Sequence, residues 1–132
     1  MKVSRKQTFL EFVPPSQKDE DGNSIPQAAI FVARGLKRRE YMKLANLIAP
    51  DEGGQVSFTL DTAFQVVAMA MCEVRNVEVE DPGGKVGPLR LEQDESGDIS
   101  FDTLDLFEPR DIFAFALFLI DNAKLDIEQV GK

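Results

Sequence analysis

The feature that most constrains the fold is the segment 108–120, which reads EPRDIFAFALFLI. Pro109 stands near its start, where a helix tolerates a residue without a backbone N–H donor, and nine consecutive apolar residues follow from position 112 to position 120. This run is too short to cross a bilayer, which needs roughly 20 apolar residues, and too apolar for a helix with one face in water. The sequence therefore predicts a helix that is covered on most sides, either by the rest of a small domain or by a partner.

The charge of the chain is divided between two regions. The 132 residues are enough for one domain with a modest core, and the net charge of −8 argues against a general nucleic-acid binder. Residues 1–50 carry nine Lys/Arg and five Asp/Glu, which gives a net charge of +4. Residues 73–111 carry four Lys/Arg and twelve Asp/Glu, which gives a net charge of −8. This polarity could orient an encounter with a partner; the alternative is that the middle of the chain is simply a solvated, loop-rich region.

Cys72 is the single cysteine, so the chain cannot form an intramolecular disulfide. Its surroundings, AMAMCEV, predict a buried small apolar residue and not a nucleophile. The N-terminus has no long apolar region of the kind found in signal peptides, and no stretch reaches transmembrane length. We therefore expect a protein of the reducing cytoplasm that does not bind membranes.

Two apolar runs near the N-terminus, residues 8–13 and 28–34, predict strands that pair antiparallel. The connecting residues 14–27 are rich in Pro, Gly, Asp, Asn and Ser and predict a long mobile loop. A helix is expected over residues 36–49, and its apolar stripe is formed by Tyr41, Leu44, Ala45 and Ile48.

A second helix is expected over residues 62–74, with Asp61 as its N-cap. Residues 75–100 predict either an acidic loop or a short second hairpin. A short helical turn over residues 101–107 then precedes the Pro109 helix, and residues 126–132 are expected to be a flexible tail. The fold class is thus a single mostly helical α+β domain over residues 1–132, with three main helices and an N-terminal antiparallel strand pair.

No pattern in the sequence supports catalysis, a cofactor or a metal. The chain contains no histidine, which is the commonest general base and a frequent metal ligand. Asp19, Asp21 and Asn23 match three positions of a calcium loop, but Ser24 and Ile30 occupy the positions that need Gly and Glu. There is also no glycine-rich phosphate loop, so we expect a protein that is not an enzyme.

The last helix offers a candidate interaction surface. Projected at 100° per residue, its predicted core face consists of Ile112, Ala116, Leu119 and Ile120. Leu117 and Phe118 are also apolar, but they fall among the charged residues that flank this face. They are therefore either exposed at an interface or covered by residues 101–107. The basic cluster on the first helix could also bind a partner or be a solvated helix face. The candidate partner-binding residues are therefore Leu117, Phe118, Arg110, Lys37, Arg38 and Arg39.

Three parts of the chain together resemble the tail assembly chaperones of long-tailed bacteriophages. They are a strand that runs into a helix (AIFVARGLKRREYMKL), an apolar helix followed by an acidic Gly turn (VVAMAMCEVRNVEVEDPGG), and the closing helix with its tail (DIFAFALFLIDNAKLDIEQVGK). The resemblance spans most of the chain but includes no invariant chemical motif. The N-terminal strand pair also gives this chain more β-structure than a purely helical member would have.

The resemblance implies a non-enzymatic assembly factor that is absent from the finished particle. Its partners would be the tape measure protein and the tail tube protein, and such proteins often self-associate, so a homo-oligomer is also expected. A second interpretation belongs to another class, a small acidic inhibitor that blocks a nucleic-acid-binding enzyme by imitating a phosphate track. The sequence leaves both functions open, and in neither does the protein itself bind nucleic acid.

Overall fold

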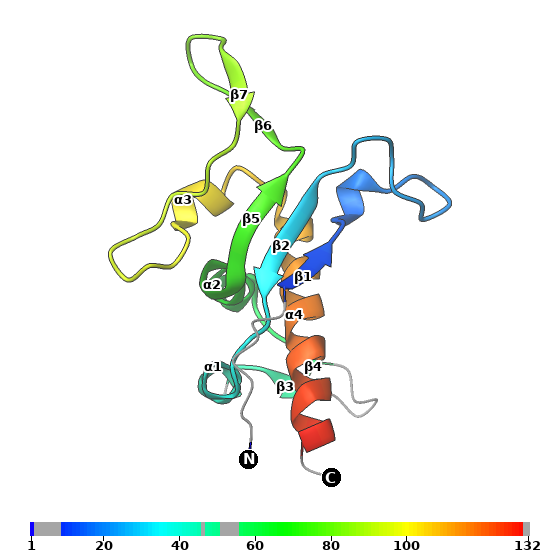
Figure 1. Cartoon of the computed structure of the whole chain (residues 1–132), viewed down its shortest axis with the longest axis vertical. Coiled ribbons are helices and arrows are strands. Elements are labelled where there is room, and N and C mark those ends of the chain that lie inside the picture. The colour runs from blue at the N-terminus through cyan, green and yellow to red at the C-terminus, as the bar shows by residue number, and fades with distance from the viewer. Residues whose placement is uncertain (2–8, 46, 51–55, 131–132) are drawn as a thin grey trace.

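A three-stranded antiparallel sheet forms the centre of the fold (Figure 1). The computed structural model describes residue 1 and residues 9–45, 47–50 and 56–130. The sheet has the order β1-β2-β5, with β1 at Phe9–Phe12, β2 at Ile30–Arg34 and β5 at Met71–Arg75. The α+β class and the N-terminal antiparallel strand pair are therefore as predicted.

Helix α2 (Leu60–Ala70) leads directly into β5, which corrects the predicted helix over residues 62–74. The hydroxyl oxygen of Thr59 accepts a hydrogen bond from the backbone N–H of Thr62 at 3.2 Å, so Thr59 and not Asp61 is the N-cap. Residues from Met71 onward pair with β2 instead of continuing the helix. Pairing with a neighbouring strand thus overrides the local helical pattern, as tertiary contacts often do.

Cys72 is exposed, contrary to the prediction that it is buried. On β5, Met71 lies opposite Ala33 and Glu73 lies opposite Val32. The register shift at this point leaves Cys72 without an opposite residue on β2. Because the prediction placed Cys72 inside a buried helix, the early end of α2 explains the error.

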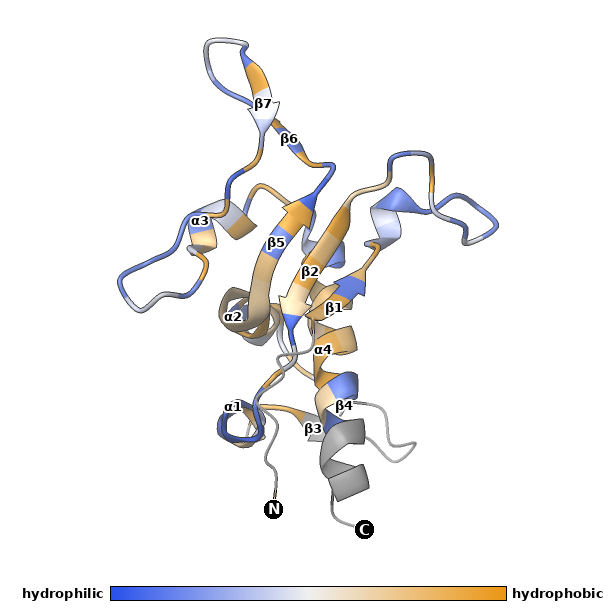
Figure 2. Ribbon diagram, in the orientation of Figure 1, coloured by the Kyte–Doolittle hydropathy of each residue, from blue (hydrophilic) through white to orange (hydrophobic). Residues whose placement is uncertain are grey.

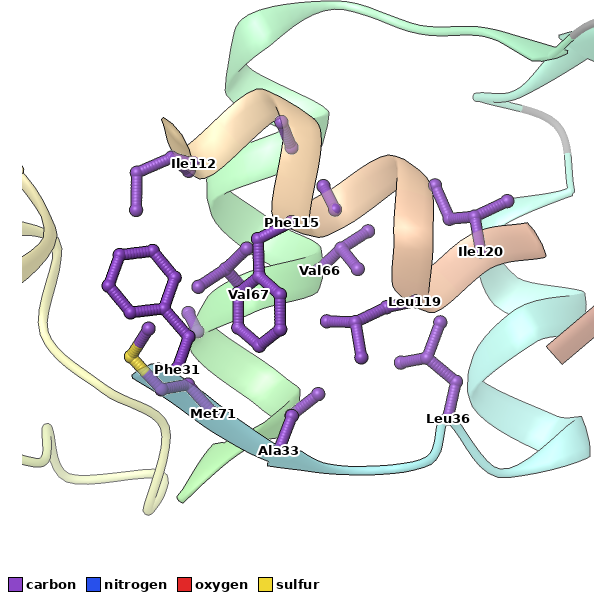
Figure 3. Close-up of a cluster of buried hydrophobic side chains, with 14 of the residues drawn as sticks. Phe31, Ala33, Leu36, Val66, Val67, Met71, Ile112, Phe115, Leu119 and Ile120 are labelled. Atoms are coloured by element: carbon purple, nitrogen blue, oxygen red, sulfur yellow. The ribbon is translucent and has the colours of Figure 1, made fainter. Parts of the chain in front are cut away.

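Helix α4 (Pro109–Val130) and α2 cover one face of the sheet and form the core with it (Figures 1 and 2). The side chain of Phe115 is fully buried, and its ring lies 5.3 Å from the rings of both Phe12 and Phe31. Figure 3 shows Val66 and Val67 of α2 beside Phe115. The predicted core face of α4 is buried in full: Ile112, Ala116, Leu119 and Ile120.

The opposite face of the sheet is covered by its own ion pairs. Val32 is buried there, although it does not belong to the core cluster, and it lies between Glu11 of β1 and Glu73 of β5. Arg75 forms salt bridges with both of these carboxylates. Directly opposed residues share a face of a sheet, so these long charged side chains shield the apolar centre of this face.

The remaining elements are short and lie around this core. The predicted helix over residues 36–49 is shorter than expected, and the second hairpin is present as β6 and β7. In the hairpin turn, Gly84 has a φ of +83°, which suits glycine, and the Asp81 carboxylate accepts the Lys85 N–H. These elements are α1 (Arg38–Leu44), β3 (Ala49–Pro50), β4 (Val56–Ser57), β6 (Glu78–Glu80), β7 (Val86–Pro88) and α3 (Phe101–Leu104).

The connection 14–27, predicted as a mobile loop, is tied to the core at one end. It begins with a short 3-10 helix, η1 (Pro15–Gln17). The buried Asp111 carboxylate of α4 accepts hydrogen bonds from the N–H and the hydroxyl of Ser16. These bonds satisfy a charged group near the start of α4; the mobility of the rest of the connection stays a prediction.

At the other end of the chain, α4 continues through Val130. The helix therefore includes most of the residues from 126 onward that were expected to form a flexible tail. Residues 131 and 132 lie outside the described residues.

The substitution Phe115→Ala is expected to lower the free energy of unfolding by about 3–5 kcal/mol, because it opens a cavity between α4 and the sheet. Urea denaturation monitored by circular dichroism measures this difference. Phe9→Ala is the matched control, since Phe9 is 55% exposed and its truncation should cost less than about 1 kcal/mol. Equal losses in the two variants would contradict the assigned core.

Candidate protein-binding surface

The two candidate apolar residues of α4 lie in different environments. Phe118 is half-buried and packs against the core, with its ring 5.1 Å from that of Phe12. It is therefore covered by β1, and not by residues 101–107 as the alternative interpretation held. Leu117 is also half-exposed, but among the described side chains it is not one of those that pack against the core.

This difference predicts unequal costs for a charge at the two positions. Phe118→Asp should lower the free energy of unfolding by at least about 2 kcal/mol, because a carboxylate would displace an aromatic contact. Leu117→Asp should change it by less than about 1 kcal/mol. Thermal melting of the two single variants measures both effects, and a larger loss for Leu117→Asp would show that the packing of α4 is wrongly assigned.

The candidate basic residues do not come together. Arg110 lies at the start of α4, where its guanidinium forms a 2.8 Å salt bridge with Glu108. Lys37, Arg38 and Arg39 are exposed at α1, which lies beside the later turns of α4 (Figure 1). The structure therefore offers two separate basic positions, and only the one at α1 contains several cations.

A groove between α1, α2 and the start of α3 is the strongest candidate for an interaction site. Its apolar lining includes Leu47 and Phe101, whose side chains are 49% and 42% exposed. We call it the α1–α2 groove, and its lining residues are Lys43, Leu44, Leu47, Gln65, Ala68, Met69, Asp94, Asp98 and Phe101. Exposed apolar side chains from separate elements that meet in one concave surface are typical of interaction sites.

An ion pair between Arg34 and Glu40 connects the two helical walls of this groove. The Arg34 guanidinium donates to both carboxylate oxygens of Glu40 at 2.7 Å and to the carbonyl of Met69 at 2.9 Å. Glu40 in turn accepts the Lys37 N–H at 2.9 Å at the start of α1. Arg34 thus satisfies a carbonyl in the last turn of α2 while holding α1 in place.

The Arg34 hydrogen bonds are the main reason why the pKa of Glu40 lies below its usual value. A carboxyl with a lowered pKa in the folded state stabilises the fold above its unfolded pKa of about 4.3, and this contribution is lost as the pH falls through the folded pKa. Glu40→Gln should therefore cost about 1–2 kcal/mol at pH 7 and much less near pH 3. Urea denaturation at both pH values tests this, and a cost independent of pH would contradict the assigned role of the ion pair.

The third wall of the groove is the loop that contains Asp94 and Asp98. The Oδ1 atom of Asp94 accepts hydrogen bonds from the hydroxyl and N–H of Ser96 and from the N–H of Asp98, and the Ser96 hydroxyl is the main cause of its lowered pKa. The pKa of Asp98 is raised, first by burial and then by the charge of Asp94. A carboxyl whose pKa is raised by folding favours the folded state at pH values below its unfolded pKa. This contribution is lost as the pH rises, so at neutral pH the charged Asp98 lowers the stability of the fold.

Two further hollows flank the base of the β6–β7 hairpin. One includes Val79, Leu89 and Leu106, and the other includes Val77 and Val86. The charges around them are mostly carboxylates that the prediction placed in the acidic middle of the chain. The exposed carboxylates of this region include Glu78, Glu80, Asp81, Glu92, Asp102 and Asp105.

Sequence reasoning did not find the α1–α2 groove. Leu47 was assigned to the interior of a predicted helix, and Met69 to a helix expected at the centre of the core. A signal was nevertheless present for Phe101, a large apolar residue that follows closely after the polar run 92–98. The groove forms because Arg34 holds α1 in place. The hydrophobic periodicity of the sequence does not reveal this contact.

The described residues contain no group of three His, Cys, Asp or Glu side chains placed to hold a metal ion. In particular, the Asp19 carboxylate accepts the N–H groups of Asp21 and Asn23 within its own loop. Among the helices in the described part of the chain, none is long and apolar enough to cross a membrane. Comparisons with protein-family models, with curated proteins and with solved structures give no match for this chain.

Proposed function

We propose that this protein is a non-enzymatic assembly factor of the cytoplasm that binds other proteins through the α1–α2 groove. Following the resemblance of the sequence, its partners are phage tail structural proteins, the tape measure protein and the tail tube protein. The single observation that carries the proposal is the groove itself, in which half-exposed Leu47 and Phe101 lie beside Leu44, Ala68 and Met69.

The chemistry of such a groove suits a helical partner. An amphipathic helix presents large apolar side chains one turn apart, and these can enter a groove between helices. A long helical chain such as a tape measure protein has many segments of this kind, which must be kept from aggregating before assembly. The groove walls are held by Arg34 and Glu40, so the surface is formed before a partner arrives.

A second candidate function is supported by the exposed carboxylates of the hairpin and α3. An acidic inhibitor would present them to the basic site of a nucleic-acid-binding enzyme. Such a complex depends on charge and should dissociate at moderate salt, whereas contacts in an apolar groove should persist. The salt at which a partner is released therefore distinguishes the two functions.

The test is co-purification of the tagged protein from its host while neighbouring genes are expressed, followed by mass spectrometry. The wild type is expected to recover a long helical structural protein or a tube subunit that stays bound at moderate salt. The double variant Leu47→Glu with Phe101→Glu should recover at least about tenfold less, because two carboxylates would enter the apolar groove.

The matched control is the double variant Ile25→Glu with Val86→Glu, which places two carboxylates on exposed apolar positions outside the groove. It should recover the partner as well as the wild type does, and circular dichroism should show that both double variants remain folded. Recovery of a nucleic-acid enzyme that moderate salt releases would contradict the assembly function and favour the inhibitor. Equal recovery by both double variants would contradict the groove as the binding site.

A further inference from the structure

The α1–α2 groove combines apolar walls with two carboxylates, those of Asp94 and Asp98. Asp98 is half-buried, and among the described contacts its carboxylate accepts no hydrogen bond and forms no salt bridge. The charge of Arg34 acts on Asp98, but the Arg34 guanidinium is already bound by both oxygens of Glu40. A cation from outside would therefore stabilise the charged form of Asp98 in this partly desolvated position.

Asp94 strengthens this preference for a cation. It lines the same wall, and its charge is the second cause of the raised pKa of Asp98. Two neighbouring carboxylates repel each other, and an ammonium or guanidinium group placed between them removes that repulsion. A negatively charged partner group would increase it.

Among the described residues that line this groove, Lys43 is the only cation, and it lies on the α1 wall. Its side chain is exposed, so the ammonium group can extend into water while its methylene groups remain beside the apolar lining. Lys43 therefore does not neutralise the acidic wall, since Asp94 and Asp98 have no salt bridge among the described contacts. The α1 wall therefore presents a positive charge to an occupant, whereas the wall that contains Asp94 and Asp98 presents negative charges.

We propose that the α1–α2 groove binds a helical partner segment in which a Lys or Arg lies one turn from a large apolar residue. The apolar side chain enters between Leu47, Met69 and Phe101, and the cation reaches Asp94 and Asp98. This inference rests on the proposed function, in that it names the partner chemistry of the same groove. Charge complementarity at the acidic wall selects this occupant over an acidic or purely apolar segment.

The test is an NMR titration of the full-length, ¹⁵N-labelled protein with synthetic amphipathic peptides of about 15 residues, long enough to form a helix on binding. The peptides share one apolar pattern and differ only in their polar positions, which are Lys, Gln or Glu. The Lys peptide is expected to bind the wild type at least about tenfold more tightly than the Glu peptide. Its shift changes should concentrate at the amides of Leu47, Met69, Asp98 and Phe101.

The decisive variant is Asp94→Asn with Asp98→Asn. The amide introduced in place of Asp94 keeps an oxygen that can accept the loop hydrogen bonds, and loss of the Asp98 charge should leave the fold at least as stable at pH 7. The affinity of this variant for the Lys peptide should fall about threefold to tenfold, while that for the Gln peptide stays unchanged. The control Glu78→Gln with Glu80→Gln removes the same charge from β6 and should bind all peptides as the wild type does.

The outcomes separate this inference from the proposed function. Equal binding of the Lys and Glu peptides in the groove would overturn the charge preference and leave the groove as a protein-binding site. An equal loss of affinity in the β6 control would mean that the net charge, and not the acidic wall, attracts the peptide, which also overturns the inference. Shift changes confined to other surfaces, or no binding, would overturn the groove as the site, while co-purification of tail proteins would still support the assembly function.

Discussion

Burial of one face of α4 against the sheet and α2 is the interaction on which the rest of the structure depends. Three short strands and helices of a few turns are marginal by themselves in water. Phe115 joins them, because its ring contacts Phe12 of β1 and Phe31 of β2 while Val66 and Val67 of α2 lie beside it. Most of the apolar run that dominates the sequence is thus buried in the protein's own core.

Arg34 connects the buried core to the candidate site. It is the last residue of the central strand β2, so its position is fixed by the sheet, and its guanidinium binds both the end of α2 and the start of α1. A half-buried ion pair with additional hydrogen bonds specifies geometry more than it adds stability. Here the specified geometry is the placement of α1, and Leu47 and Lys43 of the groove depend on that placement.

The sequence predicted the elements that depend on local pattern and failed where tertiary pairing decides. The strand pair, the second hairpin and the core face of α4 follow from alternation, turn residues and helical periodicity. The early end of α2 does not, because Met71 is apolar enough for either a buried helix or a strand, and only β2 selects the strand. The groove was missed for the same reason: Leu47, Met69 and Phe101 are distant in sequence and meet only through the folded core.

If the protein is the assembly factor that we propose, the composition of the groove bears on how it would release its partner. Leu47 and Phe101 are the large apolar residues of its described lining that are more than two-fifths exposed, so the apolar surface that it offers to one occupant is small. Weak binding at one site is compatible with strong coverage of a long chain, because many copies bound along it add their effects. Weak binding would also allow each copy to be displaced from the chain during assembly. An acidic wall would then set which segments are bound, whereas the small apolar area would keep each contact reversible.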